Sequence, residues 1–172
     1  LYFKNKLIDF PRMKTIPDYS IVKVSGKTVL CIGGAMSLDR FDREQEILNR
    51  KVRHKKELST YWKDEFPIFN QDLLSEITAL GIVIDTIITH SAPDFCYPLA
   101  KGNLARRIIH DPSLEKDIKM EREVLSKIYN KLIADGHHIQ DWLYGHFHTS
   151  HIEFISGVRY RLLDIDELIE II

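Results

Sequence analysis

The feature that most constrains the fold is the alternation of short apolar runs with amphipathic helical patterns. Residues 82–89 form an apolar, β-branched run, which is typical of a strand buried on both faces. Residues 139–144 form a second such strand. Between them, residues 113–135 carry apolar side chains on one helical stripe, formed by Leu114, Ile118, Leu125, Ile128 and Leu132. A strand, a helix of this length and a second strand predict two neighbouring parallel strands joined by a right-handed crossover.

Antiparallel hairpins are predicted on either side of this unit. Each consists of two apolar or alternating segments around a glycine-containing turn: residues 19–24 with 28–32, and residues 151–156 with 158–165. The last residues, 166–172, are expected to form a short helix or a tail. Strands that alternate with helices and end in hairpins favour an α/β fold, with residues 1–172 in a single domain.

Two more helices are expected in the first half of the chain. Residues 39–58 are densely charged with few apolar positions, which indicates a mostly solvated helix. Asn70 is a suitable cap for a helix over residues 71–80, and Gly81 is a suitable terminator. Its expected buried face consists of Leu73, Leu74, Ile77 and Leu80. Asp111 and Pro112 are expected to start the long helix over residues 113–135.

Composition excludes several classes of protein. The 172 residues are enough for one hydrophobic core, and 24 basic residues against 25 acidic ones exclude a strongly basic DNA-coating protein. No apolar run approaches the ~18–20 residues that a membrane span requires, so no membrane partner is expected. Two cysteines, Cys31 and Cys96, are too few for a disulfide scaffold and fit a reducing compartment, which predicts a cytoplasmic location.

Three of the eight histidines follow directly on predicted strands. His90 follows the strand over residues 82–89, and His146 and His148 follow the strand over residues 139–144. Ligands of open α/β sheets gather beyond the carboxyl ends of the strands, and neutral imidazole is a common metal ligand. A lone histidine at such a place is more often a surface or hydrogen-bonded residue. A His-x-His pair is more specific, because two charged imidazoles repel each other.

Four segments resemble the calcineurin-like metallophosphoesterases. Residues 144–148, Tyr-Gly-His-Phe-His, resemble the last motif of that family, Gly-His-x-His, and residues 89–93, Thr-His-Ser-Ala-Pro, resemble its penultimate motif. Residues 31–40 resemble the Gly-Gly-Ala-x-Ser-x-Asp segment of a bacterial branch. Residues 61–65, Tyr-Trp-Lys-Asp-Glu, match the aromatic and acidic stretch that follows it there. The resemblance covers about residues 20–165.

This resemblance implies a layered α/β sandwich, with mixed sheets flanked by helices, and the hydrolysis of phosphoesters by a phosphatase or phosphodiesterase. It implies two divalent metal ions (Mn, Fe, Zn or Ni) that clamp phosphoryl oxygens and activate water. His90 and His146 would bind the second ion, and His148 the first. Phosphoproteins, nucleotides, cyclic nucleotides and nucleic acids are all substrates on this fold, so the resemblance specifies a phosphoester and no finer class.

The sequence departs from the family in its first three motifs, Asp-x-His, Gly-Asp-x-x-Asp and Gly-Asn-His-Asp/Glu, none of which occurs. The resemblance therefore implies that the chain is the C-terminal part of such an enzyme. The absent motifs, including the histidine that protonates the leaving group, are expected upstream of Leu1. Three imidazoles shared between two ions leave each ion short of its usual four to six ligands. The chain alone is expected to bind metal poorly and to lack hydrolytic activity.

Other residues have two interpretations each. The basic run over residues 50–56 is either a phosphate or nucleic-acid contact or a solvated helix face. Arg106 and Arg107 either clamp a phosphate or lie on the surface. Trp62 either walls the site or anchors the core. The remaining candidates are Ser37 and Asp39, which could support the site, and His137 and His138, which are interpreted as turn residues.

One alternative function belongs to a different class. The chain could be a non-catalytic binding module that retains the fold with a vestigial metal site. The two functions differ in what precedes the chain, because the enzyme requires the Asp-x-His and Gly-Asn-His motifs and the binding module does not.

Overall fold

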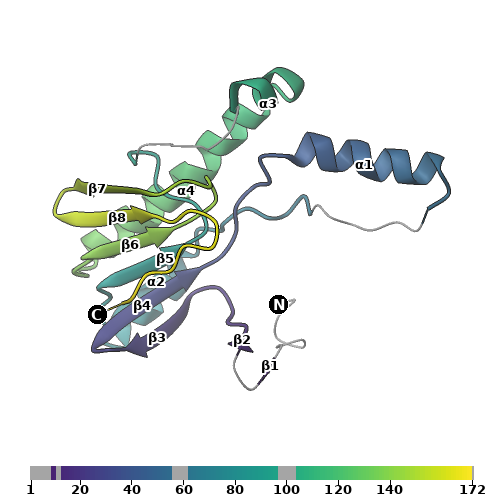
Figure 1. Ribbon diagram of the computed structural model, residues 1–172. Helices are drawn as coiled ribbons and strands as arrows, with labels where there is room; N and C mark the ends of the chain where they lie inside the picture. The colour runs from purple at the N-terminus through teal and green to yellow at the C-terminus, as the bar shows by residue number, and fades with distance from the viewer. Residues whose placement is uncertain (1–8, 11–12, 56–61, 97–103, 172) are drawn as a thin grey trace.

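The computed structural model describes residues 9–10, 13–55, 62–96 and 104–171 (Figure 1). Its elements, in chain order, are β1 (Asp9–Phe10), β2 (Met13–Lys14), β3 (Ser20–Val24), β4 (Lys27–Ile32), α1 (Arg40–Val52), α2 (Gln71–Ala79), β5 (Thr86–Thr89), α3 (Leu104–His110), α4 (Leu114–Ala134), β6 (Asp141–Tyr144), β7 (His151–Ile155) and β8 (Val158–Leu162). Lys56, the last residue of the basic run, and Tyr61, the first of the aromatic and acidic stretch, lie outside the described residues.

Six strands form one mixed sheet in the order β3-β4-β5-β6-β8-β7. The four central strands are mutually parallel, and β3 and β7 pair antiparallel at the two edges. The predicted parallel neighbours are β5 and β6, and α4 connects them, so this prediction is confirmed. The predicted α/β class and both hairpins are confirmed as well.

The core lies between one face of this sheet and helices α2 and α4, which Figure 1 places behind the strands. Leu30, Ile87, Trp142 and Tyr160 stand opposite one another on four successive strands and are fully buried. They belong to a cluster that includes apolar residues of both helices. The chain after β8 has no helix in its described part and crosses the other face of the sheet (Figure 1).

Helix α2 differs from its prediction in the face that it buries. The Asn70 side chain accepts a hydrogen bond from Leu73 N at 3.0 Å, so the predicted cap is confirmed. Leu74 and Ile77 are buried, whereas Leu73 and Leu80 are 37% and 67% exposed. The expectation of a four-residue buried face is therefore wrong, because a helix of two and a half turns reaches the core through two positions only.

The start of α4 also differs. The helix begins at Leu114, and its cap residue Ser113 makes no side-chain capping bond. Asp111, which the sequence favoured as the cap, accepts hydrogen bonds from the guanidinium of Arg40 instead. Its carboxylate is therefore used to connect this segment to the first turn of α1, and the predicted capping role is wrong.

Strand β5 is shorter than the predicted run, because the N–H groups of Ile82 and Ile84 do not bond to a neighbouring strand. Ile82 N donates to Ile77 O in α2 at 3.3 Å, and Ile84 N donates to Nδ1 of His137 at 3.2 Å. His137 is 5% exposed, and its Nε2 lies 3.2 Å from Thr78 Oγ1. The interpretation of His137 as a turn residue is thus wrong: its ring joins α2, residue 84 and the end of α4.

Helices α1 and α3 bury none of their residues. The predicted solvated character of α1 is confirmed, and Figure 1 shows it projecting from the body of the molecule. The sequence did not predict α3, because a seven-residue helix without a buried face leaves no apolar periodicity. None of the helices in the described ranges has the length and apolarity needed to cross a membrane.

Candidate functional site

The carboxyl ends of β4, β5 and β6 meet at one edge of the sheet, and a cavity of about 340 Å³ opens there. All three histidines predicted from the sequence face it. The complete lining consists of Ala35, Ser37, Leu38, Asp39, Arg43, Glu65, His90, Arg107, His146, Phe147 and His148. Residues far apart in the chain therefore build one site at the position where ligands of α/β sheets gather.

The segment after β6 projects two imidazoles through a tight turn. Phe147 is buried at 3% exposure, and the residues on either side of it have left-handed backbones, with φ of 71° at His146 and 52° at His148. Such angles are uncommon for non-glycine residues and cluster at functional sites. The two rings share the cavity because the residue between them is anchored in the core.

His90 is held by contacts between β5 and β6. The indole Nε1 of Trp142 donates to Thr89 Oγ1 at 2.7 Å, and that hydroxyl donates to the carbonyl of Ser91. Gly145 N donates to the carbonyl of His90 at 3.1 Å, which ties together the two loops that carry histidines. As a result, the rings of His90 and His146 lie with their centroids 4.9 Å apart at 61°.

Both rings of this pair favour the neutral form. Burial, together with the neighbouring imidazoles of His90 and His148, lowers the pKa of His146 to about 3. Burial also lowers the pKa of His90, with a smaller contribution from His148 in the same direction. Neutral imidazoles have a free ring lone pair, so this pair has the protonation state that metal coordination requires.

Carboxylates and guanidinium groups surround the histidines. Asp39 forms an ion pair with Arg43, with its Oδ1 2.8 Å from Arg43 Nε. Glu65 accepts hydrogen bonds from Ser37 Oγ at 2.7 Å and from Trp62 N at 3.0 Å. Ser37 and Asp39, which the sequence suggested could support the site, line the cavity, and so does Arg107. Arg43 and Glu65 also line it, although the sequence did not predict either as a lining residue.

Trp62 has neither of its suggested roles. Trp62 is 59% exposed, so it does not anchor the core, and it is not among the residues that line the cavity. Its backbone N–H positions Glu65 instead. The segment carrying Glu65 approaches very closely at Gly34, where a Cβ would lie 2.7 Å from Pro67 N, and Gly34 has φ of +95°. Only glycine suits this combination of contact and backbone angle.

Two buried charged residues of α4 shape the walls of the site. Glu121, 2% exposed, accepts a hydrogen bond from Met36 N at 2.5 Å and so holds the segment after β4. Arg122, 7% exposed, donates to carbonyls of the segment after β5, those of Ala92, Pro93, Asp94 and Cys96. Both positions lie within the apolar stripe between Ile118 and Leu125, which is the sequence signal that could have revealed them.

The donor set is incomplete as a metal site. Within residues 9–10, 13–55, 62–96 and 104–171, no group of three His, Cys, Asp or Glu side chains is arranged to hold one metal ion. The imidazole pair and the third histidine at the same cavity nevertheless offer ligands of the right chemistry. The residues present therefore fit part of the coordination that two divalent ions require.

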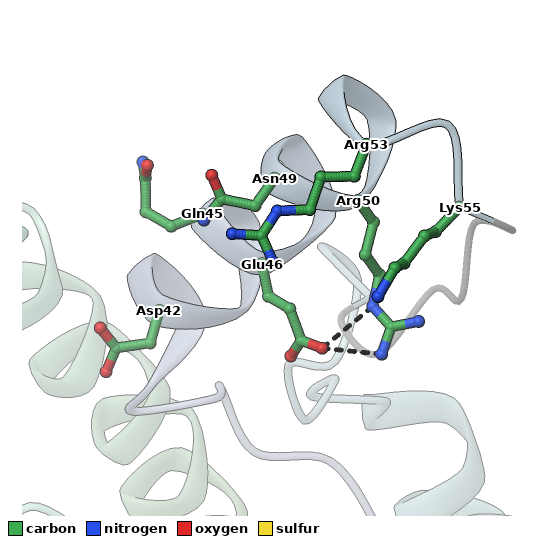
Figure 2. Close-up of a pocket in the computed structure, with 7 residues that line it drawn as sticks. All are labelled: Asp42, Gln45, Glu46, Asn49, Arg50, Arg53 and Lys55. Carbon is green, nitrogen blue, oxygen red and sulfur yellow. Dashed lines mark hydrogen bonds and ion pairs between the residues drawn. The ribbon is translucent and has the colours of Figure 1, made fainter.

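A separate pocket runs along α1 and contains most of the basic run. Its lining is Asp42, Gln45, Glu46, Asn49, Arg50, Arg53 and Lys55 (Figure 2). Arg50 pairs with Glu46 at 2.9 Å, one turn away on the same helix. Since α1 buries no residue, this surface is a solvated helix face, and its contact with phosphate or nucleic acid stays a prediction.

Models of known protein families find no match in this sequence, and no curated protein matches it either. The interpretation of the site therefore rests on its own residues and on the motifs that resemble metallophosphoesterases.

Proposed function

We propose that the protein takes part in the metal-dependent hydrolysis of a phosphoester, with His90, His146 and His148 as metal ligands in a fold of the metallophosphoesterase type. The observation that carries this proposal is the convergence of three histidines from two neighbouring parallel strands on one cavity. The low pKa of His146 also supports the proposal. The rings of His90 and His146 pack edge to face and favour the neutral form, which is the form that binds metal.

Divalent ions in such a site neutralise phosphoryl oxygens and activate water. The chain's own residues would hold these ions through the three imidazoles. Arg107 would contribute positive charge at the same cavity, where a guanidinium can pair with phosphoryl oxygens. Phe147 would exclude water behind the ring nitrogens, since it fills the core between His146 and His148.

The incomplete donor set is part of the proposal. Three imidazoles cannot supply two ions with four to six ligands each. We expect bridging carboxylates and the acid for the leaving group to come from sequence preceding Leu1, as the resemblance implies. The 172-residue chain alone should therefore bind divalent ions weakly and hydrolyse no phosphoester.

The proposal is tested with a form of the protein extended through the natural sequence before Leu1. We expect hydrolysis of an aryl phosphate with added Mn²⁺, and a loss of at least about 100-fold in His146→Ala, which removes a ligand. His138→Ala is the matched control, because His138 is exposed on the same stretch of chain and lies outside the cavity. Equal activity of both variants, or full activity of the 172-residue chain, would contradict the proposal.

The alternative is a binding module that retains the fold without catalysis. The absence of a three-donor metal group among the described residues favours it. This alternative predicts that the extended form lacks activity with Mn²⁺, Fe²⁺, Zn²⁺ and Ni²⁺ while it still binds inorganic phosphate at the histidine cavity.

A further inference from the structure

A second cavity, of about 480 Å³, adjoins the histidine cavity. It is lined by Leu38, Asp39, Phe41, Asp42, Arg106, Arg107, His110 and Asp111. Leu38, Asp39 and Arg107 line both cavities, so the two share a wall and a group bound in one can extend into the other. The volume falls in the range of ~300–1,000 Å³ that accommodates small-molecule ligands.

Two aromatic rings lie in the wall of this second cavity. Phe41 from the first turn of α1 and His110 from the end of α3 stack with centroids 5.6 Å apart and planes inclined by 18°. His110 is exposed and Phe41 is half-buried, so the pair is not a core contact. Stacked, accessible rings are the surface on which planar aromatic ligands bind.

The charges around the rings are nearly balanced. Two of the three carboxylates are already paired, Asp39 with Arg43 and Asp111 with Arg40. Asp42 remains as an acceptor on the cavity wall, and Arg106 and Arg107 are the cationic groups there. A second phosphate would meet three carboxylates against two guanidinium groups in this lining, whereas a neutral heterocycle with amino and hydroxyl donors finds both rings and acceptors.

We propose that the second cavity binds the nucleoside part of a nucleoside monophosphate, stacked against Phe41 and His110, while its phosphate lies at the histidine cavity. This inference rests on the proposed function and names its substrate class. A phosphorylated tyrosine also carries a ring, but its phenyl group has no donors for Asp42, so the nucleotide fits the lining better.

The test compares ligands that differ only in the base. Adenosine 5′-monophosphate and ribose 5-phosphate are titrated into the 172-residue chain at a fixed Zn²⁺ concentration, with backbone amide NMR shifts as the readout. We expect the nucleotide to bind about tenfold more tightly, since stacking on aromatic side chains adds to the affinity of each base. Equal affinities, or tighter binding of phosphotyrosine than of the nucleotide, would overturn the inference.

Variants locate the base. Phe41→Leu combined with His110→Gln keeps comparable side-chain volumes but removes both rings, and we expect it to lose the preference for the nucleotide. Phe154→Leu is the control, because Phe154 is 73% exposed on β7 and lines neither cavity. A preference that survives in the double variant would overturn the inference. If the extended form hydrolyses an aryl phosphate but binds the nucleotide no more tightly than ribose 5-phosphate, this inference is overturned and the proposed function is left intact. If the nucleotide binds more tightly but the extended form hydrolyses no phosphoester, this inference is supported and the proposed function is contradicted.

Discussion

Arg122 illustrates how a single buried charge sets the shape of a functional loop. Its guanidinium hydrogen-bonds to carbonyls between Ala92 and Cys96, the segment that leads away from His90. Arg122→Met would leave these buried carbonyls without partners, at a cost of about 2–4 kcal/mol in the free energy of unfolding. Urea denaturation measures this loss. Lys119→Met on the same helix is the control: its ion pair with Glu123 is exposed, so its loss should cost under ~1 kcal/mol. Equal losses would contradict the assignment.

His137 should make the stability depend on pH. Burial lowers its pKa in the folded protein, and the unfolded chain takes up the proton near the ordinary value of ~6.5. Between these two values the unfolded state binds more protons, so stability falls as the pH drops below about 6.5. His137→Asn keeps an acceptor for Ile84 N but does not titrate, and we expect a smaller fall between pH 7.5 and 5.5. His90 and His146 have pKa values lowered in the same direction, so part of the fall remains.

Denaturation at a series of pH values in this range tests the prediction. The control is His138→Asn, because His138 is exposed beside His137. A pH dependence that is the same in His137→Asn as in the unmodified protein would show that the buried ring is not the cause.

Helix α1 is attached to the body through few side chains. It buries no residue, and its first residue, Arg40, contacts Asp111 at 2.5 Å and Asp117 at 2.8 Å. All three side chains are largely shielded from solvent, so this attachment is stronger than an exposed pair. Arg40→Met should accelerate hydrogen exchange across α1 on the order of tenfold, because hydrogen bonds to charged groups contribute ~1.5–3 kcal/mol.

Hydrogen exchange followed by mass spectrometry resolves α1 from the sheet. Arg50→Met is the matched variant, since it breaks an exposed pair with Glu46 within the same helix, worth ~0.3–0.5 kcal/mol. If both variants accelerate exchange equally, Arg40 does not attach the helix.

The elements that the sequence predicted well are those with a periodic apolar signal. The stripe on α4 and the β-branched run before His90 gave the parallel pair β5 and β6 correctly. Elements that depend on polar contacts were missed or misplaced. Asp111 is used by Arg40 rather than as a cap, and the backbone of residue 84 bonds to His137 rather than to a strand. Pattern reasoning cannot foresee such partners, because they are distant in the chain.

At the scale of the whole molecule, the sheet places strand ends together, and this rule alone was enough to predict that His90, His146 and His148 share one cavity. The rest of the lining could not be predicted in this way. Glu65 reaches the cavity because its segment packs against Gly34, and Arg43 reaches it from a helix without a buried face. Neither position follows from strand order.

The proposed function requires that His90, His146 and His148 all act as metal ligands. The most direct measurement is a titration with Zn²⁺, a diamagnetic ion, followed through the imidazole nitrogens in long-range ¹H–¹⁵N correlation spectra of the 172-residue chain. This readout detects weak binding and distinguishes all eight histidines. We expect the ring signals of His90 and His146 to shift together over one concentration range and that of His148 to respond to Zn²⁺ as well, while the other five stay in place. Shifts confined to other histidines, or independent titration of His90 and His146, would contradict the proposed function.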